Sequence, residues 1–298
     1  MAPVKSANPI KFKINKFNMQ WVGADGDGKI LVFLGKRKTG KSVLVIDYLW
    51  HNQDFPLGTV ISPTDELNQT YVKHIPSIFI HSKFTDKLIE DFLNRQRKFV
   101  AKTKNDPQYA NIDARAFLIL DDCLYNAKNW ATNEDICWIF MNGRHAHITL
   151  LLTAQYVFGI GPMLRTNVDY VFICKEPKIV NREKLHDNYA GMFPSFAFFN
   201  KVMAVCTKNY GCLVIDNGST SDKIEDQVFW YRALVHEEDF KVCYDQFWVN
   251  NDAFRAAAIE RNDRVDGNGD PCEEGEVDEY QKFSNKKNAI KFDIEMGE

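Results

Sequence analysis

A short segment near the start of the chain has the residue types and spacing of a phosphate-binding loop. Residues 35–42 read Gly-Lys-Arg-Lys-Thr-Gly-Lys-Ser, which matches the pattern G-x-x-x-x-G-K-S/T. The glycines let backbone N–H groups curl around phosphates, the lysine reaches the β- and γ-phosphates, and the last hydroxyl binds Mg²⁺. The pattern predicts binding of ATP and Mg²⁺ by Gly35, Lys38, Thr39, Gly40, Lys41 and Ser42.

Two adjacent acids follow an apolar run in the middle of the chain. Asp121 and Asp122 come directly after the buried-strand pattern at 117–120. An acid at the carboxyl end of a strand beside a phosphate loop is suited to hold Mg²⁺, so Asp121 is the expected metal-linked acid alongside Ser42. Asp122 is the expected general base that polarises the attacking water. The alternative is an acidic turn without a catalytic role.

Four further polar residues are candidates for the same chemistry. Gln155 follows the apolar run at 147–153, where a strand-end amide can sense the γ-phosphate or orient water. Arg144 and Arg165 are candidate arginine fingers for a neighbouring subunit, and Arg37 is a candidate within its own subunit. A fixed guanidinium stabilises transition-state charge. The alternatives are an ordinary polar strand end and solvated surface arginines.

Strands and helices must bring these residues to one edge of a sheet. Apolar runs predict strands at 29–34, 59–62, 116–120, 147–153, 168–174, 212–216 and 227–234. Helical spacing predicts helices at 41–50, 86–104, 134–142 and over most of 181–206. Alternating strands and helices indicate an α/β fold with a mostly parallel central sheet and helices on both faces.

The composition divides the chain into four segments. Residues 1–28 are predicted to be an N-terminal extension, and 29–240 hold the alternation of an ATPase domain. Residues 241–262 are predicted to be a C-terminal helical segment. Acids and glycines dominate from about 263 to 279, so 263–298 is expected to be an acidic, disordered tail.

The overall composition argues against a disulfide-stapled protein and against a membrane-spanning one. The seven cysteines are scattered singly, which argues against a disulfide framework and for a reducing compartment. No apolar run approaches the ~18 residues that span a bilayer, so no transmembrane segment is expected. The net charge of −3 does not by itself indicate nucleic-acid binding.

Two local basic groups are candidate DNA contacts, with a solvated face as the alternative for each. The first comprises Arg95, Arg97, Lys98, Lys102 and Lys104, and the second comprises Lys175, Lys178, Arg182 and Lys184.

A series of motifs in a fixed order carries a family resemblance. After the phosphate loop come Leu-Asp-Asp-Cys-Leu-Tyr (120–125), Met-Asn-Gly-Arg-His (141–145), Thr-Ala-Gln-Tyr (153–156), Leu-Arg-Thr-Asn-Val-Asp-Tyr (164–170), Asn-Tyr-Ala-Gly-Met-Phe-Pro-Ser-Phe (188–196) and Cys-Leu-Val-Ile-Asp-Asn (212–217). In this combination the chain resembles the genome-packaging ATPases of nucleocytoplasmic large DNA viruses. It is most similar to the algal-virus and giant-virus branch, which is related to the poxvirus packaging ATPase and belongs to the FtsK–HerA group.

The resemblance implies both a fold and a function. The fold is a RecA-like, additional-strand P-loop core in which the strand of Gln155 lies between the strand of the Lys41 loop and that of Asp121. The function is a homo-oligomeric ring, a pentamer or hexamer, that moves double-stranded DNA into a preformed capsid without sequence preference. The implied partners are a capsid, portal-vertex or membrane protein, in the host cytoplasm at the viral factory and in the virion.

The resemblance also assigns roles to residues. Lys41 and Ser42 bind ATP and Mg²⁺, Asp121 is the metal-linked acid and Gln155 is the sensor. Asp122 stands where many members carry glutamate, and its side chain is one methylene shorter. Arg144 is the first choice for the arginine finger.

Two other functions stay open. One is a P-loop kinase acting on a small molecule, which needs an acceptor pocket and a lid. The other is a non-catalytic, ATP-gated capsid assembly factor, which binds nucleotide with little turnover.

Overall fold

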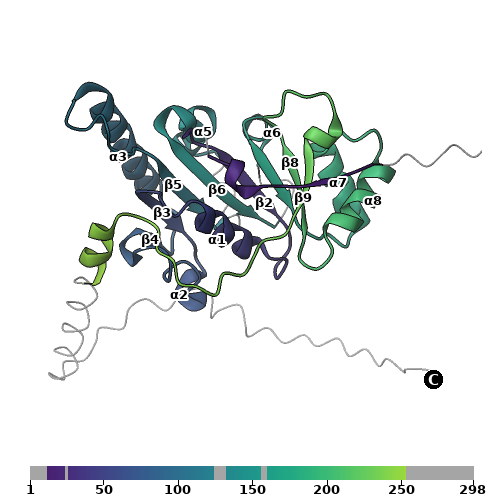
Figure 1. The fold of residues 1–298 in the computed structure, drawn as a ribbon, viewed down its shortest axis with the longest axis horizontal. Coiled ribbons are helices and arrows are strands. Elements are labelled where there is room, and N and C mark those ends of the chain that lie inside the picture. Colours follow the sequence, from purple (N-terminus) through teal and green to yellow (C-terminus); the bar gives the residue numbers. More distant parts are fainter. Residues whose placement is uncertain (1–11, 24–25, 124–131, 156–159, 253–298) are drawn as a thin grey trace, which may run out of the picture. The chain divides into compact units, whose positions relative to one another are not determined.

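A nine-stranded sheet forms the centre of the computed structural model (Figure 1). The structure describes residues 12–23, 26–123, 132–155 and 160–252. The strands lie in the order β1-β9-β8-β7-β2-β6-β5-β3-β4. Their bounds are β1 Asn15–Lys16, β2 Ile30–Leu34, β3 Leu57–Ile61, β4 Ile80–His81, β5 Ala116–Leu120, β6 Ile148–Ala154, β7 Tyr170–Ile173, β8 Cys212–Asp216 and β9 Val228–Tyr231.

Almost all neighbouring strands of this sheet are parallel. Strand β8 is the exception, because it runs antiparallel to both β7 and β9. Strand β6 lies between β2 and β5, with Ala154 opposite Leu34 and Leu152 opposite Leu120. The predicted α/β class and strand order are therefore confirmed. The carboxyl ends of β2, β6 and β5 meet at one edge of the sheet.

The central strands are apolar throughout because both faces of the sheet are covered. Every residue of β2, β5 and β6 is buried. Side chains alternate between faces along a strand, so Leu118 and Leu150 join one core while Phe117 and Leu151 join the other. Such continuous apolar runs are typical of parallel strands buried on both sides.

The helices cover these two faces unequally. Their bounds are α1 Lys41–His51, α2 Asp65–Asn68, α3 Asp86–Asn105, α5 Glu134–Asn142, α6 Pro162–Arg165, α7 Ile179–Tyr189 and α8 Phe196–Cys206. Apolar residues of α3, α5, α7 and α8 belong to the first core. The second core contains α1 together with Phe17 and Met19 from the start of the described chain and Phe240 and Val242 after β9.

The segments outside the predicted core contribute to it where the structure describes them. Asn15–Lys16 pairs with β9, and Phe17 lies against the rings of Tyr170 and Phe172. A helix begins at Asp245 and continues to residue 252, where the described chain ends. The remainder of the predicted helical segment and the predicted acidic tail lie outside the described residues. The domain boundaries stay predictions.

No helix within these described ranges has both the length and the apolar character that crossing a bilayer requires.

A buried carboxylate ties helix α1 to the chain that follows β9. Asp47 is fully buried, and the Tyr231 hydroxyl donates to its Oδ2 at 2.5 Å. His236 Nε2 lies 2.7 Å from its Oδ1, and the His236 ring stacks on Trp50 at 4.2 Å between centroids. Since a buried carboxylate is stable only when hydrogen bonded, these contacts hold α1 in place.

We expect Asp47→Ala to lower the free energy of unfolding by about 2–4 kcal/mol, because it leaves two buried polar groups without their acceptor. Urea unfolding followed by circular dichroism measures the change. Asp91→Ala is the matched control, since Asp91 is exposed on α3 beside Lys87 and should show no measurable effect. Equal stability of the two variants would contradict a structural role for Asp47.

Candidate nucleotide-binding site

The predicted phosphate loop connects β2 to α1. Gly40 adopts φ +97° and gives α1 no side-chain cap, so the first N–H groups of the helix are left for another acceptor. Lys38 also lies in the left-handed region, with φ +63°. A Cβ at Gly35 would lie 2.7 Å from the Cβ of Cys174, so only glycine fits where the loop passes β7.

The lysine of the loop folds back onto it. Lys41 Nζ donates to the Lys36 carbonyl at 3.1 Å, and Thr39 Oγ1 donates to the same oxygen at 2.7 Å. Burial lowers the pKa of the Lys41 ammonium, and the charges of Asp122 and Asp121 oppose this shift. Both carboxylates therefore lie within electrostatic reach of the lysine.

The acid pair at the end of β5 is organised by one hydroxyl of the neighbouring strand. Thr153 Oγ1 donates to Oδ1 of Asp121 at 2.6 Å and accepts the backbone N–H of Asp122 at 2.9 Å. Ser62, after β3, lies 3.5 Å from the other oxygen of Asp121. Asp122 has φ +54°, a left-handed conformation that ends the strand. Burial raises the pKa of Asp121, and the hydrogen bond from Thr153 opposes that rise.

Gln155 completes this cluster from the end of β6. Its Nε2 donates to Oδ1 of Asp122 at 2.5 Å. A neutral amide on the exposed edge of the acid pair can orient the carboxylate and, through its oxygen, a water molecule. The structure thus brings Asp121, Asp122 and Gln155 together beside Lys41, as the sequence motifs predicted.

Two of the candidate arginines lie at the other edge of the sheet. Arg144 belongs to the short helix η4 (Gly143–Ala146) that precedes β6, is 54% exposed, and lies 3.8 Å from Asp169. Arg165 ends α6, where it donates to the Ile160 carbonyl at 3.0 Å. Arg37 lies in the loop itself. In one subunit, Arg144 and Arg165 are therefore remote from the phosphate loop, and a finger role for either requires a second subunit.

The sequence analysis gave no role to several residues that shape the site. Thr153 is the clearest: it stands in the motif at 153–156, and its signal was a hydroxyl residue near the carboxyl end of a mostly aliphatic strand. Glu176 is another: its buried carboxylate accepts the Lys178 N–H at 2.8 Å and pairs with Lys36 Nζ at 3.0 Å. This ion pair fastens the phosphate loop to the chain after β7.

Relatives of the chain occur in large DNA viruses. It is 42% identical over 231 residues to the uncharacterized protein L437 of Acanthamoeba polyphaga mimivirus, a match that covers 77% of this chain and 80% of that protein. It is 34% identical over 210 residues to the uncharacterized protein 075L of Invertebrate iridescent virus 6, covering 70% and 76%. The chain belongs to this family of large DNA virus proteins. No family model matches it.

The chain shares its fold with a solved packaging protein. The structure of the genome packaging NTPase B204 from Sulfolobus turreted icosahedral virus 2 in complex with AMP matches with a TM-score of 0.50 and 18% identity. The match covers 70% of this chain and 98% of that chain. The chain therefore has the fold of this NTPase, and the resemblance to proteins of large DNA viruses that the motifs indicated is confirmed.

We expect Thr153→Val to lower the free energy of unfolding of this family member by about 1–3 kcal/mol, because the buried Asp121 carboxylate and the Asp122 amide each lose a partner. Thr153→Ser keeps the hydroxyl and should retain most of the stability. Chemical unfolding of the three proteins tests this expectation. A valine variant as stable as the wild type would show that the hydroxyl does not organise the acid pair.

Proposed function

We propose that this chain is an ATP-hydrolysing motor that translocates double-stranded viral DNA into preformed capsids. The observation that carries the proposal is the meeting of the Lys41 loop, the Asp121–Asp122 pair and Gln155 at one sheet edge. Phosphoryl transfer depends mainly on positioning and electrostatic stabilisation, and this arrangement supplies both. The packaging NTPase named above, which has the same fold, supports the assignment to genome packaging.

Each residue has a defined part in the proposed reaction. Loop N–H groups and Lys41 bind the phosphates, where Lys41 exchanges its bond to the Lys36 carbonyl for a charged oxygen. Ser42 and Asp121 would hold Mg²⁺ through the hydroxyl and carboxylate oxygens that it prefers, and the ion would supply positive charge to the phosphates. Asp122, held by Gln155, accepts the proton of the attacking water.

The predicted DNA contacts differ in how free their side chains are. On α3, Arg97 packs over the Trp138 ring at 4.0 Å and Arg95 over the Phe92 ring at 5.4 Å. After β7, Arg182 donates to Asn200 Oδ1 at 2.6 Å. These arginines are engaged within the chain, which makes them weaker candidates for contacts with phosphates.

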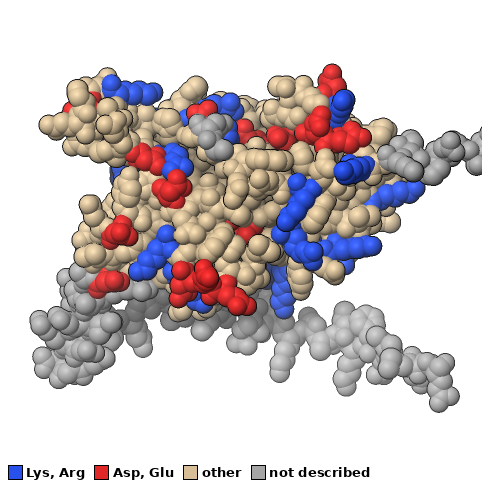
Figure 2. Space-filling view, in the orientation of Figure 1, with Lys and Arg blue, Asp and Glu red and all other residues tan. Residues whose placement is uncertain are grey.

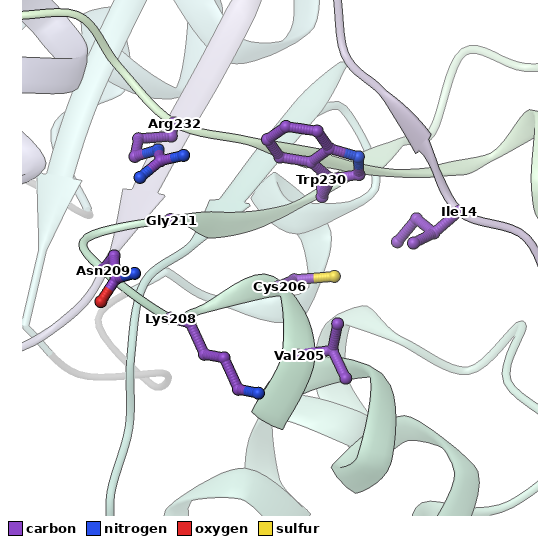
Figure 3. A pocket seen from close by; sticks show the side chains of 8 residues that line it. All are labelled: Ile14, Val205, Cys206, Lys208, Asn209, Gly211, Trp230 and Arg232. Carbon is purple, nitrogen blue, oxygen red and sulfur yellow. The ribbon is translucent and has the colours of Figure 1, made fainter.

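A different basic surface suits the backbone of DNA better. Figure 2 shows Lys and Arg side chains gathered on the part of the molecule that holds β8, β9, α7 and α8. Within it, Lys208 and Arg232 line a hollow against Trp230 (Figure 3), and Lys16 Nζ lies 6.0 Å from the Trp230 ring. Contacts of lysine and arginine with phosphates carry no sequence information, as a packaging motor requires.

The assembly extends beyond a single chain in this proposal. A homo-oligomeric ring, a pentamer or hexamer, encloses the DNA and docks on a capsid, portal-vertex or membrane protein. It acts in the host cytoplasm, at the viral factory, and stays with the virion.

The decisive measurement is ATP hydrolysis by the purified protein with and without duplex DNA, alongside its mass in solution. We expect turnover that rises with DNA and a stimulation that fades at high salt, since phosphate contacts release counterions.

Asp122→Asn should lower kcat on the order of 100-fold or more while MgATP affinity stays within a few-fold. Asparagine also tolerates the left-handed backbone at this position.

The other outcomes separate the competing functions. DNA-independent transfer of phosphate to a small-molecule acceptor would identify a kinase. Nucleotide binding with no turnover, unchanged by Asp122→Asn, would identify an assembly factor. Unchanged hydrolysis with and without DNA in an assembled ring would contradict a motor.

Mixing two inactive variants tests the arginine finger. Lys41→Ala removes the phosphate-binding lysine of a subunit. Arg144→Ala removes the arginine that would complete the nucleotide site of the neighbouring subunit. If Arg144 acts between subunits, each variant alone should hydrolyse little ATP, while mixed rings should regain part of the activity. Arg165→Ala serves as the comparison in the same experiment. Recovery of ATP hydrolysis with Arg165→Ala but not with Arg144→Ala would identify Arg165 as the arginine finger.

A further inference from the structure

A hollow borders the phosphate loop on the side opposite the acid pair. Its lining residues come from the loop, the end of β7 and the connection between α8 and β8: Lys38, Thr39, Lys175, Thr207, Asn209 and Tyr210. In the sheet, β7 flanks β2 on this side, whereas β6 and β5 flank it on the other. The hollow and the Asp121–Asp122 pair therefore lie on opposite sides of the loop.

The direction of a bound nucleotide follows from this placement and rests on the function proposed above. A triphosphate lies along the loop as a linear chain. Its γ-phosphate must face Asp122 and Gln155, where hydrolysis takes place. The α-phosphate and the nucleoside attached to it must then leave the loop on the β7 side, which is where the hollow lies.

The connection between α8 and β8 that helps to line the hollow has a constrained backbone. Asn209 and Tyr210 both adopt left-handed conformations, with φ +49° and +60°. A Cβ at Gly211 would lie 2.2 Å from the Cys206 carbonyl oxygen, so the chain has no room for a side chain there. The Thr207 hydroxyl donates to the Met203 carbonyl at 2.7 Å. This backbone presents the Tyr210 ring, which is 74% exposed.

The chemistry of the lining fits a nucleoside next to a polyphosphate. Lys38 and Lys175 supply positive charge, and no carboxylate is among the lining residues. The Asn209 side chain carries both a donor and an acceptor for a base edge or a ribose. An aromatic ring such as that of Tyr210 stacks on any nucleobase, because every base has a π-face. We propose that this hollow is the nucleoside subsite and that Tyr210 stacks on the base.

Calorimetric binding of two probes tests the proposal: MgATP, and Mg-tripolyphosphate, which lacks the nucleoside. Tyr210→Ala should weaken MgATP binding on the order of 10-fold, because one stacking contact is lost, and leave tripolyphosphate binding unchanged. Tyr210→Phe keeps the ring and should bind both probes like the wild type. Tyr244→Ala is the matched control, because Tyr244 is also an exposed tyrosine but is not among the residues that line the hollow. Its backbone N–H donates to the carbonyl of Pro56, before β3.

The outcomes distinguish failure of this inference from failure of the proposed function. If the wild type binds both probes and Tyr210→Ala binds MgATP equally well, the nucleoside subsite is wrong and the phosphate site stands. If Tyr210→Ala weakens both probes to the same extent, Tyr210 supports the loop and does not contact the base. If the wild type binds neither probe, both proposals are overturned.

Discussion

Parallel pairing of β2, β6 and β5 is the constraint on which the rest of the structure depends. Ala154 lies opposite Leu34, and Leu152 opposite Leu120, so β2 and β6 end level and β5 ends two residues short of them at the same edge. Apart from Thr153 within β6 and Ser62 after β3, the polar residues of the candidate site follow one of these ends or the adjacent end of β7. A shift of one residue in register would turn every side chain of a strand to the other face and separate Thr153 from Asp121. Because both faces of these strands are buried, the apolar packing on each side opposes such a shift.

The electrostatic properties of the site follow from the charged groups that meet at this edge of the sheet. The ammonium of Lys41 and the carboxylate of Asp121 meet where burial disfavours their charged forms, as the lowered pKa of Lys41 and the raised pKa of Asp121 indicate. Neutral partners hold them: the Lys36 carbonyl, the Thr153 hydroxyl and the Gln155 amide. Each of these bonds is weaker than one to a phosphate oxygen or a cation, so the same groups are ready to exchange partners.

The parts of the fold that local pattern determines were predictable. The expected ranges 116–120, 134–142 and 212–216 coincide with β5, α5 and β8, since each is an apolar or amphipathic run bounded by polar residues. Strands β1 and β4 were missed because each has two residues, too few for any periodicity. For the site, strand ends predicted the positions of Asp121, Asp122 and Gln155. The bridging contacts of the Thr153 hydroxyl and the Lys36–Glu176 ion pair were not predictable, because both join segments that are distant in the sequence, which no local pattern encodes.

If Arg144 is the arginine finger of the proposed ring, its location constrains how subunits associate. It precedes β6, at the amino edge of the sheet, whereas the phosphate loop follows β2 at the carboxyl edge. For Arg144 to reach a phosphate, one edge of a subunit must face the opposite edge of the next. Such a contact is heterologous, with different surfaces on its two sides, and a two-fold symmetric dimer cannot form it reciprocally through one patch. Repetition of that contact gives an assembly with a direction, which is the geometric prerequisite for pushing a polymer one way.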